Sequence, residues 1–268
     1  MKILIFGDIY GRIGRNAFLK ELPILKQKYN PDFIIVNVDN LSSGRGAIEN
    51  HILELQRSGV DLMTSGDHIF DNIEKIKDYL NNPNSKLIRA CNYYENDEFK
   101  VPGKGYKILE KNSKRLLVVH LLSANGLRDL VYNPFLKLQE ILKDFENEKL
   151  DGIIVDFHKE FTSEMYGMAL SFDGKISFGY GTHTHIQSND ELILDNGTGV
   201  INDIGMSGSL FSVIGADLSS VKSRFFTGIN KGKIEQSLDN RYVVNGAFIE
   251  IEDFKCINIE KIRIRGKL

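Results

Sequence analysis

Apolar and polar residues alternate in blocks along the first part of the chain, and the blocks predict strands and helices in turn. Residues 2–6 form a short continuous apolar run, which is typical of a strand buried on both faces. Residues 11–14 break the pattern, and the apolar residues of 16–29 then recur at helical spacing. Pro23 predicts a kink in this helix, and Asn30-Pro31 ends it.

The same alternation continues through the first third of the chain. The pattern predicts strands at 33–38 and 62–64 and helices at 48–58 and 73–80, with a polar loop at 41–46. Strands that alternate with helices indicate a mostly parallel α/β sheet, because each helix provides the crossover to the next strand.

The remainder of the chain is richer in predicted strands. The pattern indicates strands at 115–122, 152–157, 175–178, 241–251 and 257–264, and a helix at 135–148. We therefore expect an α/β protein in which two sheets pack together with helices outside them. No internal repeat or low-complexity tract divides the sequence, so residues 1–268 are expected to form a single domain.

Composition narrows the class of protein. The 34 Lys and Arg against 36 Asp and Glu give a formal net charge of −2, which argues against a broad basic face for nucleic acid. Cys91 and Cys256 form no CxxC pair, and a disulfide scaffold is excluded. The first residues lack the apolar core of a signal peptide, and no apolar run reaches the ~18 residues of a membrane span. We expect a cytoplasmic protein that does not bind a membrane.

Side chains with metal-binding or catalytic chemistry follow several predicted strands. In chain order they are Asp8, Asp39, Asn40, Asp67, His68, His158, His183 and His185. Ligands bind at the carboxyl ends of parallel strands, where such residues meet. A single Asp after a strand is more often a cap or turn residue, and a single His is more often structural, so the combination carries the prediction. His51 and His120 lie outside the pattern and are assigned structural roles.

These residue types suit a metal centre. His183 and His185 are two residues apart, so in an extended segment both side chains point to the same face. Carboxylate, amide and imidazole ligands without thiolates suit iron, manganese or zinc. Seven candidate ligands are too many for one ion, but they suit two ions that share a carboxylate. Two ions ~3.5–4 Å apart are a standard means of activating water or hydroxide for attack on phosphorus.

Several motifs then point to a family. They are GDIYGRIGR at 7–15, DN at 39–40, GDH at 66–68, RACN at 89–92, DFH at 156–158, GTHTH at 181–185 and DIGMSG at 203–208. Together they resemble the calcineurin-like metallophosphoesterases and, more closely, their YmdB-like branch of bacterial cyclic-nucleotide phosphodiesterases. The resemblance implies a four-layer α/β/β/α sandwich and two metal ions, with iron preferred and manganese, zinc or magnesium as alternatives.

The family pattern also implies a role for each candidate residue. The first metal would be held by Asp8, Asn40 and His185, the second by Asp67, His158 and His183, and Asp39 would bridge both. His68 matches the family's catalytic histidine, which would protonate the leaving alkoxide or stabilise the developing charge on the phosphoryl group.

Two positions depart from the family pattern. Asp39 stands where the branch usually has Glu, but Asp is the usual bridge elsewhere in the superfamily. Asp67 stands where the superfamily has Asn. A carboxylate there can still bind a metal, but its charge makes the site less attractive to phosphate. Our hypothesis is that Asp67 shifts the metal choice or slows turnover without abolishing metal binding.

The leading hypothesis is a dinuclear-metal phosphodiesterase that hydrolyses a small 2′,3′- or 3′,5′-cyclic nucleotide by attack of metal-bound hydroxide on phosphorus. A phosphomonoesterase or nucleotidase, and a regulatory protein with a weakly active metal site, are the alternatives. RNA is a less favoured substrate, for which the basic clusters at 104–107 and 261–267 are the candidate contacts. The resemblance implies a homo-oligomer, and the segment 206–240 could cover the site or form a subunit contact.

Overall fold

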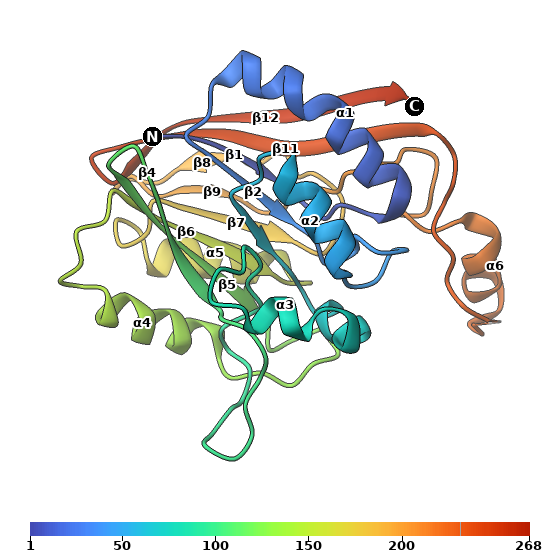
Figure 1. The fold of residues 1–268 in the computed structure, drawn as a ribbon, viewed down its shortest axis with the longest axis horizontal. Coiled ribbons are helices and arrows are strands. Elements are labelled where there is room, and N and C mark those ends of the chain that lie inside the picture. Colours follow the sequence, from blue (N-terminus) through green and yellow to red (C-terminus); the bar gives the residue numbers. More distant parts are fainter. Residues whose placement is uncertain (231) are drawn as a thin grey trace.

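Two six-stranded sheets lie at the centre of the computed structural model, which describes residues 1–230 and 232–268 (Figure 1). The first sheet contains β1 (Lys2–Phe6), β2 (Phe33–Asn37), β3 (Leu62–Thr64), β10 (Gly208–Ser209), β11 (Arg241–Glu252) and β12 (Lys255–Lys267). β1, β2 and β3 are parallel neighbours, so their carboxyl ends lie at one edge. β11 runs antiparallel beside β1 and pairs along its other side with β12.

The second sheet is mainly parallel. It contains β4 (Tyr106–Lys111), β5 (Lys114–Leu122), β6 (Gly152–His158), β7 (Phe178–Thr182), β9 (Gly199–Ile201) and β8 (Leu192–Ile193), in that spatial order. The strands from β5 through β9 in this order are parallel, and β4 and β8 are antiparallel edges.

Helices cover the outer face of each sheet. They are α1 (Gly11–Tyr29), α2 (Glu49–Arg57), α3 (Lys77–Asn81), α4 (Pro134–Asp144) and α5 (Thr162–Ser171), with a 3₁₀ helix η1 (Ile69–Lys75). A sixth helix, α6 (Leu218–Thr227), lies apart from the sheets at the side of the molecule (Figure 1). Alternate residues of β1 show the layering: Leu4 and Phe6 pack toward α1, whereas Ile3 and Ile5 pack between the sheets. A third core joins the second sheet to α4 and α5. The predicted arrangement of two sheets with helices outside is confirmed.

The prediction for the first helix was wrong at its start. α1 begins at Gly11, inside the stretch that breaks the apolar pattern, and it continues through Pro23 as one helix. The glycines there do not mark a loop. A Cβ on Gly14 would lie 2.1 Å from the carbonyl oxygen of Ser207, so glycine allows the helix to approach the chain beside β10.

Other predictions were wrong further along the chain. The strand predicted at 175–178 is largely wrong, because β7 begins only at Phe178 and Ile176 lies in a bridge to Asp173. The glycines of β7 lower its strand propensity in the sequence. Glycine is nevertheless required at position 181, because a Cβ there would lie 1.8 Å from the carbonyl oxygen of Asn202. β4, α5 and α6 were not predicted, and the helix predicted at 73–80 is η1 followed by α3.

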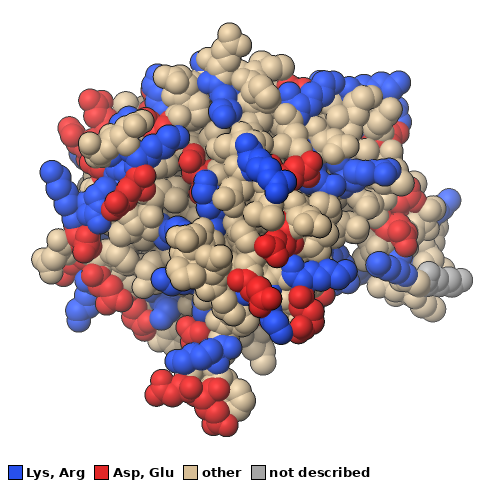
Figure 2. Space-filling view, viewed as in Figure 1, with Lys and Arg blue, Asp and Glu red and all other residues tan. Residues whose placement is uncertain are grey.

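The surface in the view of Figure 2 carries both signs of charge. Lys and Arg side chains are interspersed with Asp and Glu on this face and do not gather over one element. Within the described residues, every helix is too short or too polar to cross a membrane.

Candidate metal centre

The carboxyl ends of the two sheets bring all eight candidate residues together. Asp8, Asp39 and Asp67 follow β1, β2 and β3, which end at the same edge because they are parallel. His158 is the last residue of β6, and the chain after β7 carries His183 and His185. Asp8 lies between His158 and His185, since its Oδ1 is 3.9 Å from both His158 Nδ1 and His185 Nε2.

One group of ligand atoms gathers around His185. Its Nε2 lies 3.0 Å from Asn40 Oδ1, and its Nδ1 lies 2.8 Å from the carbonyl oxygen of Ile214. That carbonyl can only accept, so Nδ1 carries the proton and Nε2 keeps a lone pair. The Asn40 side chain donates through Nδ2 to the carbonyl of Gly44, so its oxygen faces His185. Two acceptors at this distance repel each other unless a cation lies beside both.

A second group shows the same arrangement around His158. The Thr182 hydroxyl donates to Asp156 Oδ1 at 2.8 Å and therefore accepts from His158 Nδ1 at 2.9 Å. The Nε2 lone pair of His158 then faces Asp67 Oδ1 at 3.5 Å and Asp39 Oδ2 at 3.7 Å. His158 Nε2 and Asp67 Oδ1 are buried and have no hydrogen-bond partner within residues 1–230 and 232–268.

His183 completes this second group. Its ring centroid lies 4.9 Å from that of His158, and ligand atoms of Asp67, His158 and His183 all lie within 4.8 Å of one another. His183 Nε2 is also 3.0 Å from Glu160 Oε2, and its backbone N–H donates to Asp8 Oδ2 at 3.2 Å.

The reason given above for the convergence of His183 and His185 was wrong. The segment is not extended, because both residues have left-handed backbone angles, with φ of 97° and 66°. Such conformations are costly outside glycine and concentrate at functional sites. Asp203 holds the turn by accepting from the backbone N–H and the hydroxyl of Thr184 and from the N–H of Gly205.

His68 lies beside Asp39 and Asp67 of the second group. Its backbone N–H donates to Asp39 Oδ1 at 2.9 Å, and its Nδ1 lies 3.1 Å from Asp71 Oδ2. The other ring nitrogen, Nε2, is 4.0 Å from Asp67 Oδ1. Asp71 therefore lies beside Nδ1 without a hydrogen bond, and Nε2 lies on the side of Asp67. Ligand atoms of Asp39, Asp67 and His68 also lie within 4.8 Å of one another.

Gly66 makes the approach of the two sheets possible. A Cβ at this position would lie 2.4 Å from His158 Nε2 and 2.6 Å from Asp39 Cγ. Any larger residue would separate these side chains, so the glycine before Asp67 belongs to the architecture of the site.

Two functional contacts were missed in the sequence. Asp71 lies three residues after His68, and this spacing could have been noticed, since side chains three apart eclipse in a 3₁₀ turn. No motif or spacing in the sequence indicated Arg128. Its guanidinium donates to the carbonyl of Asp67 and lies 3.8 Å from Asp67 Oδ2 and 2.6 Å from Asp71 Oδ1.

The histidines assigned structural roles lie outside the two groups. The Nδ1 of His51 is 2.9 Å from the hydroxyl of Ser42, and the Nδ1 of His120 is 3.2 Å from the carbonyl oxygen of Asp156. His120 is buried behind His158, with ring centroids 6.4 Å apart.

The electrostatics of the site fit cations. Burial raises the pKa of Asp8 to about 7, and burial with the charges of Asp67 and Asp8 raises the pKa of Asp39. Burial lowers the pKa of His158 to about 3, so its imidazole is neutral. Asp8 and Asp39, two buried carboxylates that resist ionisation, together with neutral imidazoles are a donor set that suits a divalent metal ion.

Adding Mn²⁺ is expected to raise the melting temperature of metal-stripped protein more at pH 8 than at pH 6. Below a pKa of about 7, Asp8 holds a proton that a metal must displace, so the apparent affinity falls as the pH falls. Differential scanning fluorimetry measures the shift. Asp8→Asn should reduce it, whereas Asp97→Asn, at an exposed position, should not. Equal shifts at both pH values would contradict the prediction.

The fold and this cluster define the class of protein. The structure superposes on the calcineurin-like phosphoesterase YfkN from Bacillus subtilis with a TM-score of 0.56, covering 100% of this chain and 90% of that one. At 12% identity this likeness shows the fold alone. The chain has the calcineurin-like metallophosphoesterase sandwich, with Asp and His side chains at its strand ends suited to metal ions.

The chain belongs to the family of YmdB-like proteins, whose family model matches residues 4–262. It is 35% identical over 268 residues to the 2′,3′-cyclic-nucleotide 2′-phosphodiesterase of Bacillus subtilis (strain 168), covering 98% of this chain and 97% of that protein. The crystal structure of a phosphatase from Mycoplasma pneumoniae superposes with a TM-score of 0.90 at 33% identity, covering 100% of this chain and 94% of that one.

Proposed function

We propose that this protein is a metal-dependent phosphodiesterase that hydrolyses small cyclic nucleotides, with 2′,3′-cyclic nucleotides as its first candidates. One observation carries the metal site: His158 and His185 each direct a fixed lone pair at acceptor oxygens, an arrangement that cations stabilise. The named activity of the 35% identical Bacillus protein supports the substrate class.

We assign the ligands to two ions. One ion would be held by Asp8, Asn40 and His185, and the other by Asp67, His158 and His183, with Asp39 as the shared ligand. When bound, the ions supply Lewis acidity that activates water and neutralises the phosphoryl oxygens. Oxygen and nitrogen ligands with no thiolate suit iron, manganese, zinc or magnesium, and we propose iron as the native metal.

The protein's own residues complete the chemistry. His68 Nε2 lies on the side of Asp67 and can donate a proton to the leaving ribose oxygen. Burial lowers the pKa of His68, and the carboxylates of Asp67 and Asp71 partly offset this effect. Thr182 and Asp156 hold His158, and the Ile214 carbonyl holds His185, so the ligand rings do not have to reorganise.

Metal analysis of freshly purified protein, paired with a substrate panel, tests the proposal. We expect about two metal ions per chain, hydrolysis of a 2′,3′-cyclic nucleotide and of bis(p-nitrophenyl) phosphate, and little action on p-nitrophenyl phosphate. Preference for the monoester would favour a phosphomonoesterase or nucleotidase. Two bound metals without hydrolysis under any added divalent ion would favour a regulatory protein.

The setting of the enzyme is also part of the proposal. We propose a cytoplasmic homo-oligomer, supported by the family resemblance and by Phe225 and Phe226, which are exposed on α6. The segment 206–240 also contributes to the site, since the Ile214 carbonyl contacts His185. RNA remains the less favoured substrate, in keeping with the mixed charges in Figure 2.

A further inference from the structure

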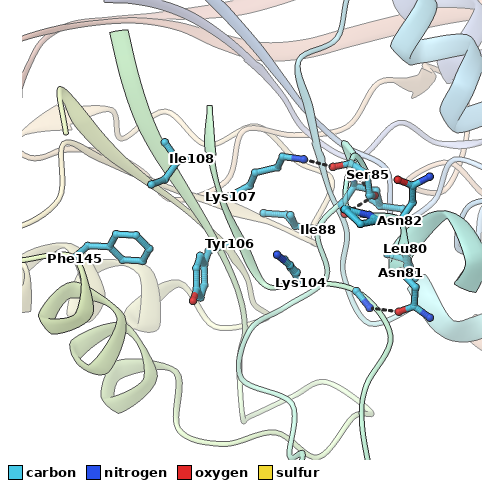
Figure 3. Close-up of a pocket in the computed structure, with 13 residues that line it drawn as sticks. Leu80, Asn81, Asn82, Ser85, Ile88, Lys104, Tyr106, Lys107, Ile108 and Phe145 are labelled. Carbon is cyan, nitrogen blue, oxygen red and sulfur yellow. Dashed lines mark hydrogen bonds between the residues drawn. The ribbon is translucent and has the colours of Figure 1, made fainter. Parts of the chain in front are cut away.

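A cavity of about 380 Å³ lies between α3, the loop that follows it, β4 and the end of α4 (Figure 3). This volume is within the range of small-molecule sites. None of the eight candidate residues of the metal centre is among the residues that line it. The cavity is therefore a separate feature of the second sheet's edge.

The cavity has an unbalanced positive charge. Lys104 and Lys107 line it, and the described lining contains no Asp or Glu. Neither lysine forms an ion pair with a described residue, and Lys107 Nζ donates instead to the carbonyl of Ser85. Burial, with the charges of Lys104 and Lys86, lowers the pKa of Lys107. Cations that lie close together without a carboxylate favour an anionic ligand.

An aromatic corner lies beside these lysines. The rings of Tyr106 and Phe145 meet edge to face, with centroids 5.4 Å apart and an interplanar angle of 85°. Ile108 packs against the same core as Phe145 and extends this apolar wall, whereas Ile88 lines the cavity from the core between the sheets (Figure 3). Tyr106 is 38% exposed although its ring is large and mostly apolar. A planar aromatic group would cover the ring and find stacking partners.

Asn81 and Asn82 form the opposite wall. Asn81 Oδ1 accepts from the N–H of Gly103 at 3.0 Å, and Asn82 Oδ1 accepts from the N–H of Asn84 at 2.8 Å. These bonds fix both side chains, and in Figure 3 their NH₂ groups point away from Lys104 and Tyr106. The features that select a ligand are therefore the two lysines and the aromatic corner.

We propose that this cavity binds a nucleoside monophosphate, with the base against Tyr106 and Phe145 and the phosphate at Lys104 and Lys107. The site is independent of the metal centre, and the inference does not rest on the proposed hydrolysis. Phosphate alone would leave the aromatic corner bare, and a nucleoside alone would leave the lysines unpaired.

Isothermal titration of the metal-loaded protein with 5′-AMP tests the proposal. We expect a binding event that the double variant Lys104→Gln/Lys107→Gln weakens at least tenfold, and that Tyr106→Leu also weakens. Adenosine and inorganic phosphate should each bind more weakly than 5′-AMP. The matched control is Lys143→Gln/Lys149→Gln, which removes two exposed lysines flanking Phe145 that do not line the cavity.

A hydrolysis assay distinguishes the role of this cavity from that of the metal centre. The double lysine variant should retain its melting temperature and its kcat/KM for bis(p-nitrophenyl) phosphate within twofold. Binding of 5′-AMP that is unchanged in the variant would overturn the proposal. So would loss of RNA-oligonucleotide binding without any loss of 5′-AMP binding, because the lysines would then belong to an RNA surface. Failure of hydrolysis in the parent protein would leave the binding result intact.

Discussion

Replacing His68 by alanine is expected to lower kcat for a cyclic nucleotide by ~10²–10⁴-fold while the metal content stays unchanged. The imidazole is the proposed proton donor, and its Nε2 lies on the side of Asp67, with Asp71 beside Nδ1. A ribose hydroxyl is a poor leaving group and needs the proton, whereas p-nitrophenolate is a good one. The loss with bis(p-nitrophenyl) phosphate should therefore be much smaller. Steady-state kinetics and metal analysis of the same preparations measure both effects.

The control for His68 is a histidine that is near in sequence but has no contact with the candidate ligands. His51→Ala removes the side chain that contacts Ser42 and should leave kcat within about threefold of the parent. Since Asp39, Asp67 and His68 also lie within metal-binding distance of one another, the metal content decides between two roles. Loss of one ion per chain in His68→Ala would show that His68 is a ligand and would contradict its assignment as the acid.

Much of the fold could be predicted because buried strands leave a strong pattern. β2, β3 and β5 lie within one residue of their predicted ends, since each is a short apolar run on a sheet covered on both faces. β7 and the start of α1 could not be predicted from local sequence. Their glycines are selected by close contacts with residues 202 and 207, and those contacts exist only in the folded chain.

Some residues of the candidate site could likewise be predicted from the sequence, and others could not. Asp8, Asp39 and Asp67 could be predicted because three parallel strands end at one edge, so position along the chain was enough. The convergence of His183 with His158 needed a left-handed turn that sequence spacing does not specify. Arg128 follows β5 in an irregular stretch, and only tertiary structure brings it to Asp67.

Asp67→Asn is expected to raise kcat/KM for a phosphodiester roughly tenfold, which corresponds to about 1.4 kcal/mol. Asp67 adds a negative charge where an anionic substrate must bind, and the amide removes it without a change of shape. Arg128 lies 3.8 Å from this carboxylate and offsets part of the charge. Kinetics at saturating Mn²⁺, with metal analysis, separate the effect on the substrate from any loss of metal affinity.

A double-mutant cycle with Arg128 tests the effect of the Asp67 charge more sharply, because it isolates the coupling between the two side chains. Arg128→Ala should lower kcat/KM roughly tenfold in the parent protein, where it removes the guanidinium charge beside Asp67, but less than about threefold in Asp67→Asn. Arg45→Ala is the matched control, since Arg45 pairs with Asp71 at 3.1 Å but forms no ion pair with Asp67. Equal losses from Arg128→Ala in both backgrounds would contradict the coupling and would place Arg128 on the substrate itself.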